Sequence, residues 1–122
     1  MVILEKWMMQ NRRIVEMGDL WIEKFKRGVV PKLIQEFEPE KILLFGSRIK
    51  GEANENSDID VIIVSQVFAG IPFVKRTPIV LKTVRFDKHI DFICYSPIEF
   101  QKIKSTSSII MDALRYGEYI VA

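Results

Sequence analysis

Hydrophobic residues recur at helical spacing in the first part of this chain. Between residues 3 and 26, Lys, Arg and Glu separate a set of apolar positions, namely Leu4, Met8, Val15, Trp21, Ile22 and Phe25. The pattern predicts a helix over this stretch. Gly18 and Asp19 can divide it into two helices, with Asp19 as the N-cap of the second.

Four later segments also have the composition of helices, and they cover residues 31–37, 73–84, 97–104 and 107–116. A proline can open the first and the third of them, and Gly117 follows the last as its expected C′ residue. In the segment 31–37, Leu33, Ile34 and Phe37 form one apolar stripe, which we expect to face the core.

Three nearly continuous apolar runs predict strands. They are KILLFG from Lys41, DVIIVS from Asp60 and HIDFICYS from His89. Such runs are typical of strands that are covered on both faces. The final segment, EYIVA from Glu118, can add a fourth strand at the edge of the sheet.

The composition is that of an ordinary globular protein. A length of 122 residues suggests one domain, with 48% hydrophobic and 28% charged residues. The net charge of +2 neither requires nor excludes nucleic acid as a partner. Cys94 is the single cysteine and cannot form an internal disulfide. With no signal peptide and no run of roughly 20 apolar residues to span a bilayer, we expect a cytoplasmic protein without a membrane anchor.

Two carboxylates mark the start of the second predicted strand. Asp58 and Asp60 are two positions apart, so they project from the same face of a strand. Two ionised carboxylates held together repel each other, and a divalent cation is the simplest compensation. A solvated strand start is the alternative, and it is favoured for the pair taken alone. Asp60, however, directly precedes the apolar run VIIV at the edge of the core.

A second feature closes the first predicted strand. Gly46 ends the run, and Ser47 can be the N-cap of a short helical turn whose backbone N–H groups bind an anion. Arg48 adds positive charge beside it. A plain turn is the equally weighted alternative. Gly46 and Gly51 have the spacing of a P-loop, but Glu and Ala follow, which excludes a Walker-type nucleotide site.

Asp91 lies inside the third predicted strand. If the first two strands are antiparallel and a helix crosses over to a parallel third strand, Asp91 reaches the same end of the sheet as Asp58 and Asp60. Three carboxylates then face the Gly46 turn, as two-metal phosphoryl or nucleotidyl transfer requires. His89 shares the face of Asp91, and we expect it to be a surface or packed residue. This order of elements predicts an α/β (α+β) fold.

The pattern Gly46-Ser47, ten residues, Asp58-Ile59-Asp60, followed by Asp91, resembles the minimal nucleotidyltransferase (MNT) domains of the DNA polymerase β-like superfamily. The resemblance covers about residues 40–95. It implies the nucleotidyltransferase fold, with a mixed central sheet of three to four strands flanked by helices. It also implies transfer of AMP from ATP that depends on Mg²⁺, with two ions expected.

The resemblance also implies roles for individual residues. Gly46 and Ser47 would hold the β- and γ-phosphates, and Arg48 would contact a phosphate. Asp58, Asp60 and Asp91 would be the catalytic metal ligands, with Asp91 also acting as the general base. We expect one domain over residues 1–122, with N-terminal helices at 1–37, the catalytic sheet core at 40–95, and C-terminal helices and an edge strand at 97–122.

MNT domains of this kind are often paired with a HEPN-domain toxin, and the resemblance implies an antitoxin that adenylylates its partner on a hydroxyl such as that of tyrosine. Only 31 residues follow Asp91, which leaves little room for an added helical domain. A partner, or a second copy in a homodimer, would then complete the site. A non-catalytic antitoxin, or transfer to a small molecule or an RNA end, is the alternative. The near-neutral charge makes nucleic acid the less expected partner.

Overall fold

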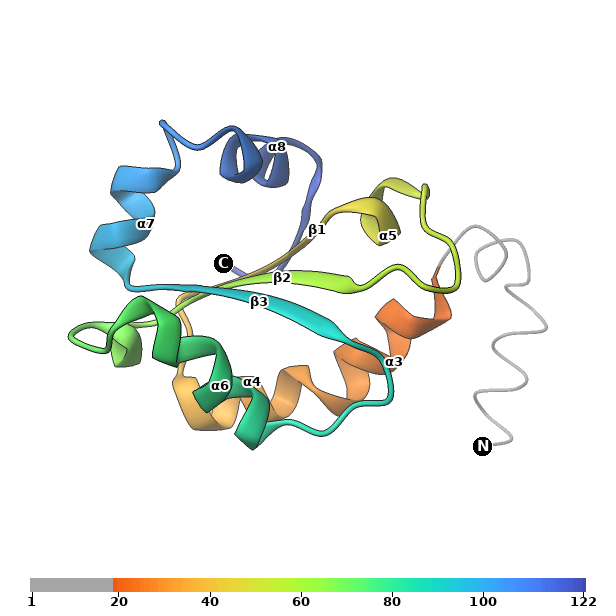
Figure 1. Ribbon diagram of the computed structural model, residues 1–122, viewed down its shortest axis with the longest axis horizontal. Helices are drawn as coiled ribbons and strands as arrows, with labels where there is room; N and C mark the ends of the chain where they lie inside the picture. Colours follow the sequence, from red (N-terminus) through yellow and green to blue (C-terminus); the bar gives the residue numbers. More distant parts are fainter. Residues whose placement is uncertain (1–18) are drawn as a thin grey trace.

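The computed structural model describes residues 19–122 and has three layers (Figure 1). A four-stranded sheet lies between helices α3, α4 and α6 on one face and helices α7 and α8 on the other. The helix expected before Gly18 lies outside the described residues. Among the described helices, none is long and apolar enough to cross a membrane.

The strand order is β3-β2-β1-β4, and the sheet is mixed as predicted. Strand β1 (Lys41–Phe45) is antiparallel to β2 (Ile59–Val64), and β2 is parallel to β3 (Ile90–Tyr95). Strand β4 (Glu118–Val121) pairs with β1 and forms the second edge, which confirms the expected fourth strand. The two central strands are almost fully buried, since helices cover both of their faces.

Asp19 caps helix α3 (Leu20–Gly28), as its sequence position predicts. Its carboxylate accepts hydrogen bonds from the backbone N–H groups of Trp21 at 2.8 Å and Ile22 at 3.4 Å. These bonds satisfy two of the free N–H groups at the start of the helix.

Helix α4 (Val30–Phe37) begins one residue before Pro31. Leu33 and Phe37 are buried, but Ile34 is 45% exposed, so the expected core stripe is wrong at that position. The reason is that Leu33 and Phe37 are one helical turn apart, whereas Ile34 is rotated about 100° away from Leu33.

Helix α6 (Phe73–Thr83) forms the crossover between β2 and β3 and also protects the edge strand. Thr77 Oγ1 donates a hydrogen bond to the carbonyl of Phe92 at 3.0 Å, and Arg76 Nη1 donates one to the carbonyl of Cys94 at 3.1 Å. A sheet edge otherwise exposes unpaired backbone groups of this kind. The crossover therefore fixes β3 in its parallel position beside β2.

Helix α7 (Pro97–Ile103) starts with a capping box formed by Ser96 and Glu99. Helix α8 (Ser108–Tyr116) ends at Gly117, whose φ of −77° is not left-handed. The expected C′ role therefore does not explain the glycine. A Cβ there would collide with the carbonyl oxygen of Ala113 in α8 and lie 2.7 Å from that of Leu44 in β1, so the tight turn from α8 along β1 requires the glycine.

Candidate functional site

The sheet brings the predicted carboxylates to one end. Phe45, the last residue of β1, lies opposite Asp60 in β2, and Asp60 lies opposite Asp91 in β3. Asp58 directly precedes β2, and Gly46 directly follows β1. The antiparallel pair and the parallel crossover therefore produce the juxtaposition that the sequence predicts.

Asp58 and Asp91 form a compact group with His89. The Nδ1 atom of His89 lies 3.2 Å from Oδ2 of Asp58 and 3.7 Å from Oδ1 of Asp91. One ligating atom from each of the three residues lies within 4.8 Å of the others. All three side chains reach solvent, with exposed fractions of 42% for Asp58, 63% for His89 and 56% for Asp91. An ion could therefore enter without a change of fold.

Asp60 is a half-buried carboxylate of the site. Burial, together with the negative charges of Asp91 and Asp58, raises its pKa from 3.8 to about 6, while His89 acts in the opposite direction. The protein thus holds a carboxylate among like charges where the ionised form is disfavoured. Such a perturbed group is typical of functional sites and of sites that gain a cation.

Gly46 is required by its contact with Asp60. Its φ is 82°, and a Cβ at this position would collide with Oδ2 of Asp60 and lie 3.0 Å from Cγ of the same residue. Helix α5 (Ser47–Lys50) starts immediately afterwards, and Gly46 is its N-cap. The prediction that Ser47 is the N-cap is wrong, because Gly46 itself accepts the first bonds of the turn, from the N–H groups of Ile49 and Lys50.

Arg48 closes the loop that leads to Asp58. Its side chain is 5% exposed, and Nε donates to the carbonyl of Ser57, the residue before Asp58, at 2.8 Å. Nη1 donates to Oδ2 of Asp19 at 2.6 Å, and Nη2 donates to the carbonyls of Asn54 and Glu55. This geometry favours a structural role for Arg48 over the predicted phosphate contact.

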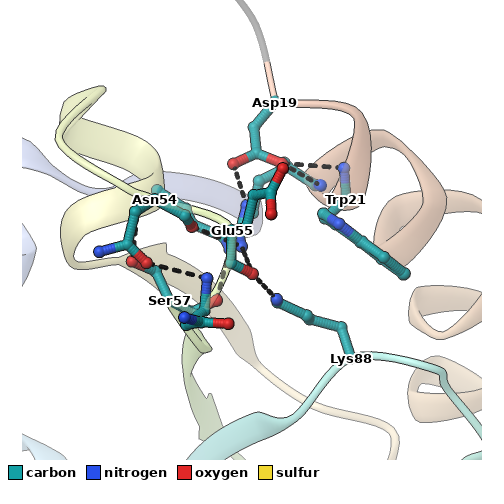
Figure 2. A network of polar contacts seen from close by, with 9 residues as sticks. Asp19, Trp21, Asn54, Glu55, Ser57 and Lys88 are labelled. Carbon is teal, nitrogen blue, oxygen red and sulfur yellow. Dashed lines mark hydrogen bonds and ion pairs between the residues drawn. The ribbon is translucent and has the colours of Figure 1, made fainter.

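The same loop is held from its other side by Lys88, as Figure 2 shows. Lys88 Nζ donates to the carbonyl of Glu55, and its ammonium lies 5.6 Å from the ring centroid of Trp21. Arg48, Asp19, Lys88 and residues 54–57 form one network, which we call the loop clasp. It joins the segment before Asp58 to the segment before Asp91.

The sequence did not reveal the loop clasp. Its members come from four separate segments, and the pairing of Arg48 with Asp19 spans 29 positions. The predicted N-cap role of Asp19 was the one feature that pointed to this network, because a capping carboxylate has a second oxygen that can bind a cationic side chain. His89 is exposed, as expected for a surface residue on the face of Asp91, but the sequence does not predict its contact with Asp58.

The donor set of this end of the sheet suits a divalent cation. Carboxylate oxygens are the ligands that Mg²⁺ prefers, and one or two of them are usual when phosphates fill the other positions. Asp58 and Asp91 are accessible and close together, and after burial their negative charges are the main cause of the raised pKa of Asp60. The residues present therefore fit the metal that a phosphate-transfer site needs.

A cavity of about 590 Å³ adjoins this group. It is formed by the end of α6 and the connection to β3, and His89 lies on its wall next to Lys88. Arg85 also lines it, and Leu81, Val84 and Phe86 give it an apolar part. Asp87 also lines the cavity, so its wall carries charges of both signs, and His89 is the residue that it shares with the carboxylate group.

Comparison with known proteins gives consistent results. The sequence pattern described as the nucleotidyltransferase domain matches residues 26–120, which is most of the chain. A candidate nucleotidyltransferase from Sulfolobus solfataricus has a crystal structure similar to this one, with a TM-score of 0.51 and 25% identity. That match covers 70% of this chain and 81% of the other.

Two further comparisons add no functional information. BolA1 from Arabidopsis thaliana is 26% identical over 57% of this chain and 87% of its own, but its TM-score is 0.42, so it carries no argument. No curated protein sequence matches this chain.

Proposed function

This chain belongs to the nucleotidyltransferase domain family, and we propose that it transfers AMP from ATP to a hydroxyl group on a partner protein. The observation that carries the proposal is the meeting of Asp58, Asp60 and Asp91 beside Gly46 at one end of the sheet. The structural likeness to the candidate nucleotidyltransferase of S. solfataricus supports the reaction class.

Asp58, Asp60 and Asp91 would hold two divalent cations, for which the family resemblance implies Mg²⁺. When bound, such ions neutralise phosphate charge and stabilise the attacking and leaving oxygens of an in-line displacement. The raised pKa of Asp60 supports this role, because the cluster gains most from a cation when its own charges repel. Gly46 and Ser47 would hold the β- and γ-phosphates through backbone N–H groups.

The proposed reaction replaces one phosphorus–oxygen bond with another. The oxygen of the acceptor hydroxyl bonds to the α-phosphorus of ATP, and the bond from that phosphorus to the oxygen that bridges to the β-phosphorus breaks. Pyrophosphate leaves with that oxygen. Asp91 accepts the proton of the hydroxyl; its exposed carboxylate can reach an acceptor that arrives from solvent.

We propose further that the acceptor is a HEPN-domain toxin and that modification neutralises it. The support for this finer assignment is the likeness of residues 46–60 to the signature of MNT antitoxins. A binding-only antitoxin is the main competitor. Intact carboxylates at all three positions favour catalysis, because binding alone would not require them to be held together against their repulsion.

Co-expression of the chain with a HEPN-domain partner tests the proposal. We expect the intact mass of the partner to increase by one or more AMP units, and Asp60→Asn to abolish the increase. Glu36→Gln is the matched control, because Glu36 is an exposed carboxylate on α4 that pairs with Lys32. An unmodified partner that is still neutralised by the triple variant Asp58→Ala, Asp60→Ala, Asp91→Ala would establish the binding-only function instead.

A further inference from the structure

We propose that His89 is a ligand of the metal site, and that the site of Asp58, His89 and Asp91 therefore takes Mn²⁺ in preference to Mg²⁺. The proposal rests on the proposed function in one respect: it takes the bound ion to be the one used in nucleotidyl transfer. It names a ligand outside the three carboxylates and changes the expected identity of the ion.

The spacing of the three side chains is close to that of ligands on one ion. In an octahedral site with bonds of about 2.1 Å, neighbouring ligand atoms lie about 3 Å apart. The distances from Nδ1 of His89 to Asp58 Oδ2 and Asp91 Oδ1 are 3.2 and 3.7 Å. Small side-chain rotations would bring all three atoms to ligating distance.

The backbone holds His89 in this position. The N–H of Ile59, which lies between Asp58 and Asp60, donates a hydrogen bond to the carbonyl of His89 at 3.1 Å. This bond extends the parallel pairing of β2 and β3, in which Ile59 is opposite Ile90. The backbone of His89, directly before β3, is therefore held next to the carboxylates by the pairing of β2 and β3.

Asp60 takes a different position in the cluster. Its carboxylate lies against Gly46, and the compact group of ligating atoms consists of Asp58, His89 and Asp91. The compact group thus offers one nitrogen and two carboxylate ligands to one ion, and the carboxylate of Asp60, the remaining proposed metal ligand, lies beside it. Such a mixed set differs from the all-oxygen set that Mg²⁺ prefers.

Ligand type governs the choice of metal. Imidazole nitrogen binds the later divalent transition metals well, whereas Mg²⁺ favours oxygen ligands and keeps its waters. Mn²⁺ resembles Mg²⁺ in its preference for carboxylate and phosphate oxygens and for octahedral geometry, but as a first-row transition metal it binds an imidazole nitrogen more readily than Mg²⁺ does. The alternative reading of the same distances is an ion pair, in which a protonated His89 neutralises Asp58 and moves away when a metal arrives.

Pulsed electron paramagnetic resonance of Mn²⁺ distinguishes the two readings without any activity measurement. His89 is the single histidine of the chain, so any imidazole nitrogen coupled to Mn²⁺ must be its own once any affinity tag is removed. We expect ¹⁴N modulation in the wild-type chain with Mn²⁺ alone, and its complete loss in His89→Gln. Mn²⁺ affinity should fall about tenfold or more in that variant, while Mg²⁺ affinity changes little.

Two variants serve as controls. Asp58→Asn should weaken both metals, because it removes a shared oxygen ligand, and Glu36→Gln should change neither. Mn²⁺ binding without nitrogen modulation, or equal Mn²⁺ affinity in wild type and His89→Gln, would overturn the ligand role of His89. Neither result would affect the proposed function, which the mass of the modified partner tests separately.

Discussion

The carboxylate of Asp60 occupies the space that any side chain at Gly46 would need. The turn that follows β1 and the central acidic residue of β2 are therefore in contact across the antiparallel pair, where Asp60 is opposite Phe45. A glycine at the phosphate-binding turn is often explained by close approach of a ligand. In this protein the side chain of Asp60 already requires a glycine at position 46, before any ligand is considered.

Gly46→Ala should disrupt the site more than it disrupts the fold. Gly46 and Gly51 both have positive φ, of 82° and 76°, but a Cβ at Gly51 would meet no atom within 4 Å. Each alanine should lower the free energy of unfolding by about 1 kcal/mol for its backbone. Gly46→Ala should also displace Asp60 and reduce nucleotidyl transfer by about a hundredfold.

Thermal unfolding and a transfer assay on both variants check this. Gly51→Ala measures the backbone cost alone. If both variants lose the same activity, the contact between position 46 and Asp60 has no functional role.

Asp60→Asn should stabilise the metal-free protein at neutral pH. The pKa of Asp60 is raised from 3.8 to about 6, so the folded state holds its proton more tightly than the unfolded state. Stability therefore falls as pH rises from about 4 to 6, and the loss persists at higher pH. Removing the charge should recover about 1–2 kcal/mol at pH 7.5, after allowance for screening of a half-buried group.

Denaturant unfolding in the presence of a chelator at pH 3.5 and 7.5 measures this difference. We expect the two proteins to converge at pH 3.5. Equal stability at pH 7.5 would mean that burial and the neighbouring charges do not disfavour the ionised form of Asp60 in solution.

Glu99→Gln should have the opposite pH dependence. Hydrogen bonds from Arg76 lower the pKa of Glu99 from 4.5 to about 2, so its charge stabilises the fold above pH 4.5 and that contribution disappears as pH falls toward 2. The variant should lose about 1 kcal/mol at pH 7, since Glu99 is partly exposed and screened. Most of the difference should be lost by pH 2 in the same unfolding experiment, and a constant difference across the range would contradict this assignment.

Arg48→Lys and Arg76→Lys form a matched pair for the loop clasp. Both arginines are buried, each binds a carboxylate at 2.6 Å, and each also donates to backbone carbonyls. A lysine cannot satisfy all of these acceptors, so each variant should lose about 1–3 kcal/mol of stability. Only Arg48→Lys should also weaken Mn²⁺ binding, because it releases the carbonyl that precedes Asp58.

Titration of the metal by calorimetry at a temperature where both variants are folded separates the two effects. Equal metal affinity in Arg48→Lys and Arg76→Lys would limit the loop clasp to stability.

The sequence predicted the features that depend on periodicity and on chain connection. Apolar runs located three strands, and the crossover rule placed Asp91 beside Asp60, as the register confirms. Local detail was less predictable. The exposure of Ile34 depends on the direction in which a short helix meets the sheet, and the N-cap at Gly46 instead of Ser47 depends on a contact with Asp60 across β1 and β2.

The sequence pattern did not predict the long-range polar contacts. Positive charge at Arg48, next to a phosphate-like turn, suggested a ligand contact, but its acceptors are Asp19 and the backbone of residues 54–57. The sequence does not indicate which acceptors the guanidinium of Arg48 contacts in the folded protein. The contact of His89 with Asp58 was unpredictable for the same reason. Asp58 precedes β2, whereas His89 precedes β3, and the two residues are 31 positions apart.

Transfer of labelled phosphate is the most direct test of the central claim that this end of the sheet performs nucleotidyl transfer. The purified chain would be incubated with its co-expressed partner, Mn²⁺ or Mg²⁺, and ATP labelled on either the α- or the γ-phosphate. We predict that only the α-label becomes attached to the partner, and that Asp58→Asn, Asp60→Asn and Asp91→Asn each abolish attachment. Attachment of the γ-label, or undiminished α-label with Asp91→Asn, would contradict the account.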